Sequence, residues 1–133
     1  MVQSKDWKII NDNKRDYIKI GQILNAVEIH TSNSLEHELK KLEICYNLKK
    51  EGHNFMTEAI LKNGSRPDII VLDVKPPIAY EVMKSESDES IKNKETTYGD
   101  IKIIPVRLWV YIFLILKMKN GIARDVITLL RAM

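Results

Sequence analysis

Cysteine is almost absent from this 133-residue sequence, because Cys45 is the only one and no intrachain disulfide can form. The lack of disulfides is typical of a reducing compartment, so we expect a cytoplasmic, intracellular protein. Cys45 lies in a stretch with helical periodicity, which favours a packing role over a nucleophilic one. The three histidines, His30, His37 and His53, have no companion ligands at zinc-site spacing, so we expect no structural zinc site.

Long apolar segments are also missing. Residues 1–8 contain no apolar core of the kind that a signal peptide has. The strongest apolar run, Leu108 to Met118, has only eleven residues, too few to cross a bilayer as a helix. We therefore expect no membrane association and interpret this run as a core or interface element.

Neither sign of charge dominates, since the sequence has 21 Lys and Arg and 18 Asp and Glu. Hydrophobic residues make up 44% of the sequence. This composition indicates one ordinary globular domain and excludes a disordered chain. The positive charge gathers in residues 101–133, where six basic residues stand against Asp125 alone. A basic end suits a polyanion such as nucleic acid, and a solvated surface explains it equally well.

A helix over residues 34–51 is predicted by apolar residues that recur at every third or fourth position. The apolar stripe consists of Leu35, Leu39, Leu42 and Tyr46. Asn33 or Ser34 can cap the start of this helix, and Gly52 marks its end.

Strands are predicted on both sides of a second helix. The expected strands are 54–61, followed by an Asn63-Gly64 turn, then 68–73, 78–83 and 101–107, and the second helix runs from Ser85 or Ser87 to Tyr98. Pro105 suggests that the last strand lies at an edge or a bulge. The pattern predicts a mixed β-sheet flanked by helices. We divide the chain into an N-terminal extension (1–33), a core (34–107) and a C-terminal apolar element and helix (108–133) within the same domain.

Two carboxylates on neighbouring predicted strands form the pattern of greatest chemical interest. Arg66-Pro67-Asp68 begins one strand, and Glu81 lies thirteen residues after Asp68. Side chains alternate faces along a strand, so both acids can point into one cleft, with Glu36 of the preceding helix as a third. Mg²⁺ takes oxygen ligands and keeps several waters, so two or three carboxylates suffice to hold it. Such a cation lowers the pKa of a water, as phosphodiester hydrolysis at neutral pH requires.

These motifs resemble those of the PD-(D/E)xK nucleases, which share the restriction-endonuclease-like fold. The resemblance covers about Glu36 to Arg107 and rests on Glu36 to Leu42, Glu51-Gly52-His53, Pro67-Asp68 and Glu81-Val82. Within this superfamily the chain is most similar to small archaeal Holliday-junction resolvases and related archaeal and viral proteins. The resemblance implies Mg²⁺- or Mn²⁺-dependent cleavage of DNA, including branched DNA, and favours DNA over RNA as the partner.

The same resemblance implies roles for individual residues. By position it makes Asp68 and Glu81 the metal ligands, together with the main-chain carbonyl of Val82. Glu36 matches a helical glutamate that contacts the metal or its waters, and Glu43 is the fallback for that role.

At one catalytic position the chain departs from the superfamily. A lysine that orients or activates the water is expected two residues after the glutamate, and this chain has Met83 there. Three explanations stay open: Lys84 turned inward by a bulge, a lysine that has migrated to the following helix as Lys94 or Lys92, or loss of catalysis. The alternative function is therefore an inactive nuclease-fold protein that binds nucleic acid or a protein partner. A third interpretation is an unrelated α/β interaction module.

Ordinary structural roles also stay open for the three acids. Asp68 can cap the turn that starts a strand, and Glu81 can be a solvent-facing strand residue. Glu36 can be a first-turn acid that the helix dipole favours.

The run 108–116 is apolar on every face, more than a half-buried strand or a surface helix requires. Large exposed apolar patches are uncommon on monomers, so this run predicts a two-fold homodimer in which it meets its copy. A central core helix or strand is the alternative.

Overall fold

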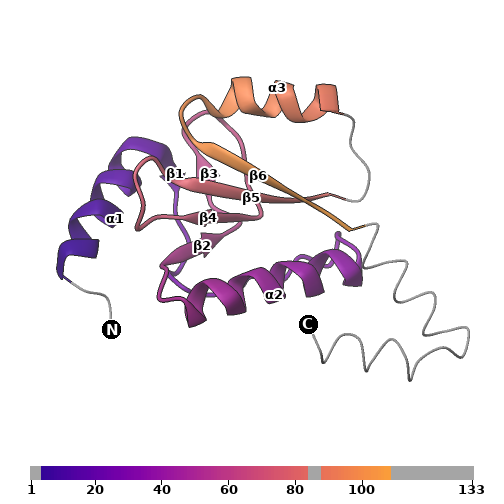
Figure 1. The fold of residues 1–133 in the computed structure, drawn as a ribbon, viewed down its shortest axis with the longest axis horizontal. Helices are drawn as coiled ribbons and strands as arrows, with labels where there is room; N and C mark the ends of the chain where they lie inside the picture. The colour runs from indigo at the N-terminus through magenta and orange to yellow at the C-terminus, as the bar shows by residue number, and fades with distance from the viewer. Residues whose placement is uncertain (1–3, 84–87, 109–133) are drawn as a thin grey trace, which may run out of the picture.

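A computed structural model describes residues 4–83 and 88–108 (Figure 1). The elements follow in the order α1 (Ser4–Tyr17), β1 (Ile18–Ile20), α2 (Leu35–Lys50), β2 (Phe55–Thr57), β3 (Ile60–Leu61), β4 (Ile69–Val71), β5 (Ile78–Met83), α3 (Asp88–Tyr98) and β6 (Lys102–Arg107). The protein is thus mixed α/β. Within these residues no helix has both the length and the apolar character needed to cross a membrane. The apolar run after Leu108, and with it the expected dimer contact, lies outside the described residues.

A four-stranded sheet in the order β2-β4-β5-β6 forms the centre of the fold. β4 pairs antiparallel with β2 and β5, whereas β6 is parallel to β5 and is reached through α3. The predicted mixed sheet is therefore confirmed. Pro105 lies in β6, the outermost strand of the sheet among the described residues, as its lack of an N–H group led us to expect.

Each face of the sheet is covered by its own apolar cluster. Ile69 of β4 packs with Cys45 of α2 on one face. Ile70, the next residue of β4, packs on the opposite face with Ile10 of α1 and Tyr98 of α3. Figure 1 accordingly shows α2 on one side of the sheet and α3 on the other. The alternation along β4 decides which residues meet at the candidate site.

α2 closely matches the helix predicted over residues 34–51. The Ser34 hydroxyl accepts a hydrogen bond from the His37 amide at 3.1 Å, and Gly52, with φ +85°, follows the end of the helix. The face toward the sheet is made by Lys41, Cys45 and Leu48, which are buried. The apolar stripe is instead exposed, with fractions of 40% to 69% among its four residues.

The single strand predicted over residues 54–61 is wrong, because the structure divides it into β2 and β3. Glu58 separates them and has φ +58°, a left-handed conformation that is rare for residues other than glycine. This residue turns the chain out of the sheet, and β3 pairs with β1 instead, with Ile18 opposite Leu61. Neither this turn nor β1 was predicted from the sequence.

The N-terminal segment is tied to the sheet. Asn13 of α1 is fully buried, and its amide nitrogen donates hydrogen bonds to the main-chain oxygens of Leu72 and Val74, both at 2.8 Å. The Tyr17 hydroxyl donates to Asp100, just before β6, at 2.6 Å. The segment predicted as an N-terminal extension therefore packs as part of the same folded unit.

Cys45 provides a test of the packing between α2 and the sheet. Its side chain is only 2% exposed, and burial raises the pKa of the thiol to about 12. Because the thiolate is the reactive form, we expect a thiol reagent such as DTNB to label the native protein on the order of 100-fold more slowly than the denatured chain. Equal labelling rates in buffer and in denaturant would contradict this packing.

Candidate functional site

Asp68 and Glu81 lie opposite each other at one end of the sheet. β4 and β5 are antiparallel with Ile69 opposite Tyr80, and one further step of this register places Asp68 opposite Glu81. Directly opposed residues point to the same face of a sheet, with their Cβ atoms about 5 Å apart. By alternation this is the face that α1 and α3 cover. Both acids are buried.

Two contacts hold the Asp68 carboxylate. Its Oδ2 accepts a hydrogen bond from the Val82 amide at 2.7 Å, and its Oδ1 lies 3.4 Å from Nε2 of His37. Asp68 is thereby fixed against the residue that follows Glu81 and against the first turn of α2. Sequence reasoning missed His37, although its place directly after Glu36, at the start of a capped helix, was a usable signal.

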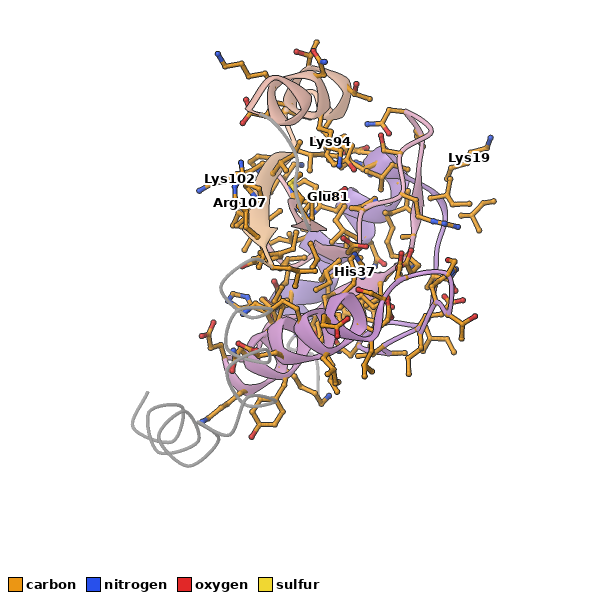
Figure 2. The ribbon with its side chains drawn as sticks, turned by 90° about the vertical axis from the view of Figure 1, so that its right-hand side faces the viewer. Lys19, His37, Glu81, Lys94, Lys102 and Arg107 are labelled. Atoms are coloured by element: carbon orange, nitrogen blue, oxygen red, sulfur yellow. The ribbon has the colours of Figure 1, made fainter. Side chains whose placement is uncertain are left out.

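α3 supplies the contacts of Glu81. The Tyr98 hydroxyl donates a hydrogen bond to Oε1 of Glu81. Nζ of Lys94 lies 3.9 Å from Oε2 of the same carboxylate, and both Lys94 and Glu81 are labelled in Figure 2. Burial, together with this hydrogen bond, raises the pKa of Tyr98, so its phenol stays a protonated donor. Tyr98 was also missed, and its signal was the four-residue spacing from Lys94, which places both on one helix face.

Met83 is buried at the position where the superfamily pattern has its lysine. β5 pairs with β6 in unbroken register as far as Met83, so no bulge occurs within this strand. Lys84 lies outside the described residues, and the side chain of Lys92 is exposed. Of the lysines considered from the sequence, the geometry places Lys94 beside Glu81.

The two remaining predicted acids lie differently. Glu36 is half-buried, and within residues 4–83 and 88–108 its carboxylate makes no hydrogen bond or ion pair. Glu43 pairs with Lys40 at 3.0 Å on the outer surface of α2. The structure thus brings Asp68 and Glu81 together, and the residue of α2 that contacts Asp68 is His37, not Glu36.

A metal at this site would have few protein ligands. Across the described part of the chain no group of three or more His, Cys, Asp or Glu side chains is arranged to hold a metal ion. Two carboxylates and the main-chain carbonyl of Val82 are the available donors. This set fits Mg²⁺ or Mn²⁺, because Mg²⁺ is usually held by one or two carboxylates and keeps several waters.

A buried ion cluster, formed by Lys41, Glu38 and Glu58, lies behind Asp68. Lys41 is 0% exposed, and its ammonium group donates to the main-chain oxygen of Glu28 at 2.6 Å. The same Nζ lies 2.7 Å from Glu38 and 3.1 Å from Glu58. All three ammonium donors therefore have acceptors, which is the condition for burying a charge.

The buried ion cluster reaches Asp68 by two routes. Through side chains, Nδ1 of His37 lies 3.1 Å from Glu38, and its Nε2 lies 3.4 Å from Asp68. Through the main chain, the Glu58 amide donates to the Asp68 carbonyl at 3.2 Å. The left-handed turn at Glu58 brings this carboxylate to Lys41 while its amide faces Asp68. Both routes restrict the motion of Asp68.

A cavity of about 290 Å³ opens next to Glu81. Its lining is polar and consists of Ser65, Arg66, Glu81, Lys94, Thr97 and Tyr98. Arg66 connects this cavity to the buried ion cluster, because its Nε lies 3.4 Å from Glu58. The candidate site therefore combines a pair of acids with basic and hydroxyl groups around an open space.

Comparison of the chain with protein-family models, curated proteins and solved structures gave no match.

Proposed function

We propose that this protein is a divalent-metal-dependent nuclease of the PD-(D/E)xK type that hydrolyses phosphodiester bonds in DNA. The observation that carries the proposal is the pairing of Asp68 with Glu81 on one face of the sheet, with Lys94 approaching from α3. The order of the elements supports it: a capped helix, three antiparallel strands, a second helix and a strand parallel to the third. This order agrees with a restriction-endonuclease-like core.

Each residue of the site has a defined task in this proposal. Asp68, Glu81 and the carbonyl of Val82 hold Mg²⁺ or Mn²⁺, which when bound supplies a water of lowered pKa and neutralises charge on the phosphate. The Val82 amide and the Tyr98 hydroxyl orient the two carboxylates through the hydrogen bonds that they donate. The Lys94 ammonium orients the attacking water or binds a phosphate oxygen, the task assigned to the lysine that Met83 replaces.

Two further elements of the proposal rest on the sequence. The resemblance favours DNA, including branched DNA, as the substrate, and the apolar run 108–116 predicts a homodimer. The dimer contact was expected in the run 108–116, and it stays a prediction.

The test is a cleavage assay with Mg²⁺ or Mn²⁺ on linear, flapped and four-way DNA, run with the wild type and Asp68→Ala. We expect cleavage that EDTA abolishes and that Asp68→Ala reduces by more than about 100-fold, since even outer partners of a metal site are worth about 10- to 100-fold. The control is Asp16→Ala, which removes an exposed carboxylate that pairs with Arg15 on α1. A folded wild type that cleaves none of the three substrates with either metal would contradict the proposal.

The second candidate function is binding of nucleic acid without cleavage, and the buried Met83 favours it. The same assay separates the two, because a binding protein retards the DNA in a gel without shortening it. In that case the acid pair is a structural remnant and its loss leaves retardation unchanged.

A further inference from the structure

We propose that the cavity beside Glu81 is a phosphate-binding subsite in which Arg66 recognises a phosphate group of the nucleic-acid strand. We further propose that this phosphate and the divalent cation bind cooperatively. The source of the phosphate rests on the proposed function, whereas the subsite itself is inferred from Arg66, its anchor and the charges around it.

Arg66 is anchored at one end and open at the other. Its Nε lies 3.4 Å from the Glu58 carboxylate, while the side chain as a whole is 53% exposed and lines the cavity. A guanidinium group presents five N–H donors in a rigid planar fork that matches two oxygens of a phosphate. Contact through Nε engages one of these donors and leaves the terminal NH₂ groups to face a ligand.

The anchor of Arg66 is itself immobile. Glu58 is buried, and its other carboxylate oxygen pairs with the fully buried Lys41. A long surface side chain normally loses conformational entropy when it binds a ligand. Because Arg66 pairs with a fixed carboxylate, its side chain has lost part of this entropy before the ligand binds. The cluster that restrains Asp68 thus also restrains Arg66.

The rest of the cavity suits a phosphate group. Around Arg66 it offers the amine of Lys94 and a polar wall made by Ser65, Thr97 and Tyr98, although the Tyr98 hydroxyl already donates its hydrogen to Glu81. Its volume of about 290 Å³ corresponds to about ten water molecules, which leaves room for a phosphate with part of a sugar. Among the described residues Glu81 is the single acid in the lining, and it is also a proposed metal ligand.

The cation matters because Asp68 and Glu81 place two buried carboxylates beside the cavity. Their negative charge opposes the entry of an anion. A divalent cation held by the two carboxylates offsets this charge. The two ligands therefore raise each other's affinity, and by linkage they do so by the same factor.

The first experiment titrates inorganic phosphate into the wild-type protein, with and without Mg²⁺, and follows main-chain amide signals by NMR. We expect saturable shifts at Ser65, Arg66 and Thr97 and an affinity that Mg²⁺ raises by at least about 5-fold. Arg66→Gln should weaken phosphate binding by about 10-fold or more, because a charge-assisted bidentate contact is lost. Arg66→Lys, which keeps the charge without the fork, should give an intermediate loss. Arg15→Gln, at an exposed arginine of α1, is the matched control.

A second experiment identifies the source of the phosphate. It compares, by fluorescence anisotropy, the binding of one oligonucleotide with a 5′-phosphate or a 5′-hydroxyl group in Ca²⁺, another cation with oxygen ligands. An Arg66→Gln defect for both oligonucleotides indicates an internal phosphodiester, and a defect only for the first indicates a terminal phosphate. Either result supports the subsite.

Equal phosphate and DNA affinities of Arg66→Gln, Arg15→Gln and the wild type would overturn the subsite. Phosphate binding that Mg²⁺ leaves unchanged would overturn the cooperativity. A wild type that binds phosphate at these residues but cleaves no DNA would sink the proposed function and leave the subsite standing. Cleavage of DNA by the wild type and by Arg66→Gln with equal rates and affinities would support the proposed function and overturn the subsite.

Discussion

Lys41→Met is expected to lower the free energy of unfolding by about 3–5 kcal/mol, the cost of leaving buried carboxylates without their cation. Lys41 is fully buried between Glu38 and Glu58, and methionine matches its shape but supplies no donor. Chemical denaturation measures the change. Lys40→Met is the matched control, since Lys40 forms a surface pair with Glu43 and should be worth less than about 1 kcal/mol. Equal losses from the two variants would contradict a stabilising ion cluster.

The pH dependence of the same two proteins provides a second readout. Burial alone would raise the pKa of Glu38, but hydrogen bonds from Lys41, Asn33, the His30 amide and His37 outweigh it and lower this pKa to about 2. The wild type therefore keeps the contribution of Glu38 above its ordinary pKa of 4.5 and loses it as the pH falls toward about 2. Lys41→Met removes one of these hydrogen bonds and leaves the burial, so the pKa of Glu38 should rise and this variant should lose less stability than the wild type as the pH falls. The difference between the two proteins should narrow in acid.

Lys94→Met is expected to reduce DNA cleavage by at least about 100-fold, the usual contribution of a positioned proton-transfer or phosphate-binding group. Lys94 brings its amine to 3.9 Å from Glu81 and is partly exposed, so its ion pair should contribute less than about 1 kcal/mol to stability. Single-turnover cleavage and thermal unfolding separate the two effects. Lys92→Met, at an exposed lysine of the same helix, should cleave normally.

Met83→Lys completes this test. A lysine at position 83 shares the sheet face of Glu81, because side chains two residues apart in a strand point the same way. We expect Met83→Lys to restore cleavage in the Lys94→Met background, because the new lysine places an amine beside the Glu81 carboxylate from β5 instead of from α3. Full activity of Lys94→Met would show that this lysine has not taken over the missing role. Inactivity of the wild type that Met83→Lys relieves would show that catalysis was lost at this position alone.

Much of the fold could be predicted because its signals are local. The bounds of α2 follow from the Ser34 cap and Gly52, and β5 coincides with the predicted strand 78–83. The left-handed turn at Glu58 could not be predicted in this way. The turn brings the Glu58 carboxylate to Lys41, a buried lysine seventeen residues earlier, which donates a hydrogen bond to it. A strand pattern does not encode such a tertiary requirement.

In the candidate site, too, the residues with local sequence signals could be predicted, and those that depend on tertiary packing could not. Asp68 and Glu81 were found from the sequence, since strand periodicity and an antiparallel register suffice to place them together. His37 and Tyr98 were not found, because their contacts depend on how α2 and α3 pack against the strand ends. Lys94 was one of several candidates, and the packing of α3 singles it out.

The position of Pro105 in β6 has a consequence for how this protein meets other molecules. The amides of Lys102 and Leu108 donate to the main-chain oxygens of Pro77 and Met83, so even-numbered amides of this strand point toward β5. Position 105 therefore faces the opposite side, where proline has no N–H to give. A strand docking there would lack a hydrogen bond at the middle of the ladder. Within the described part of the chain, this edge of the sheet is thus poorly suited to pairing with a strand of another chain, and recognition along it is left to side chains.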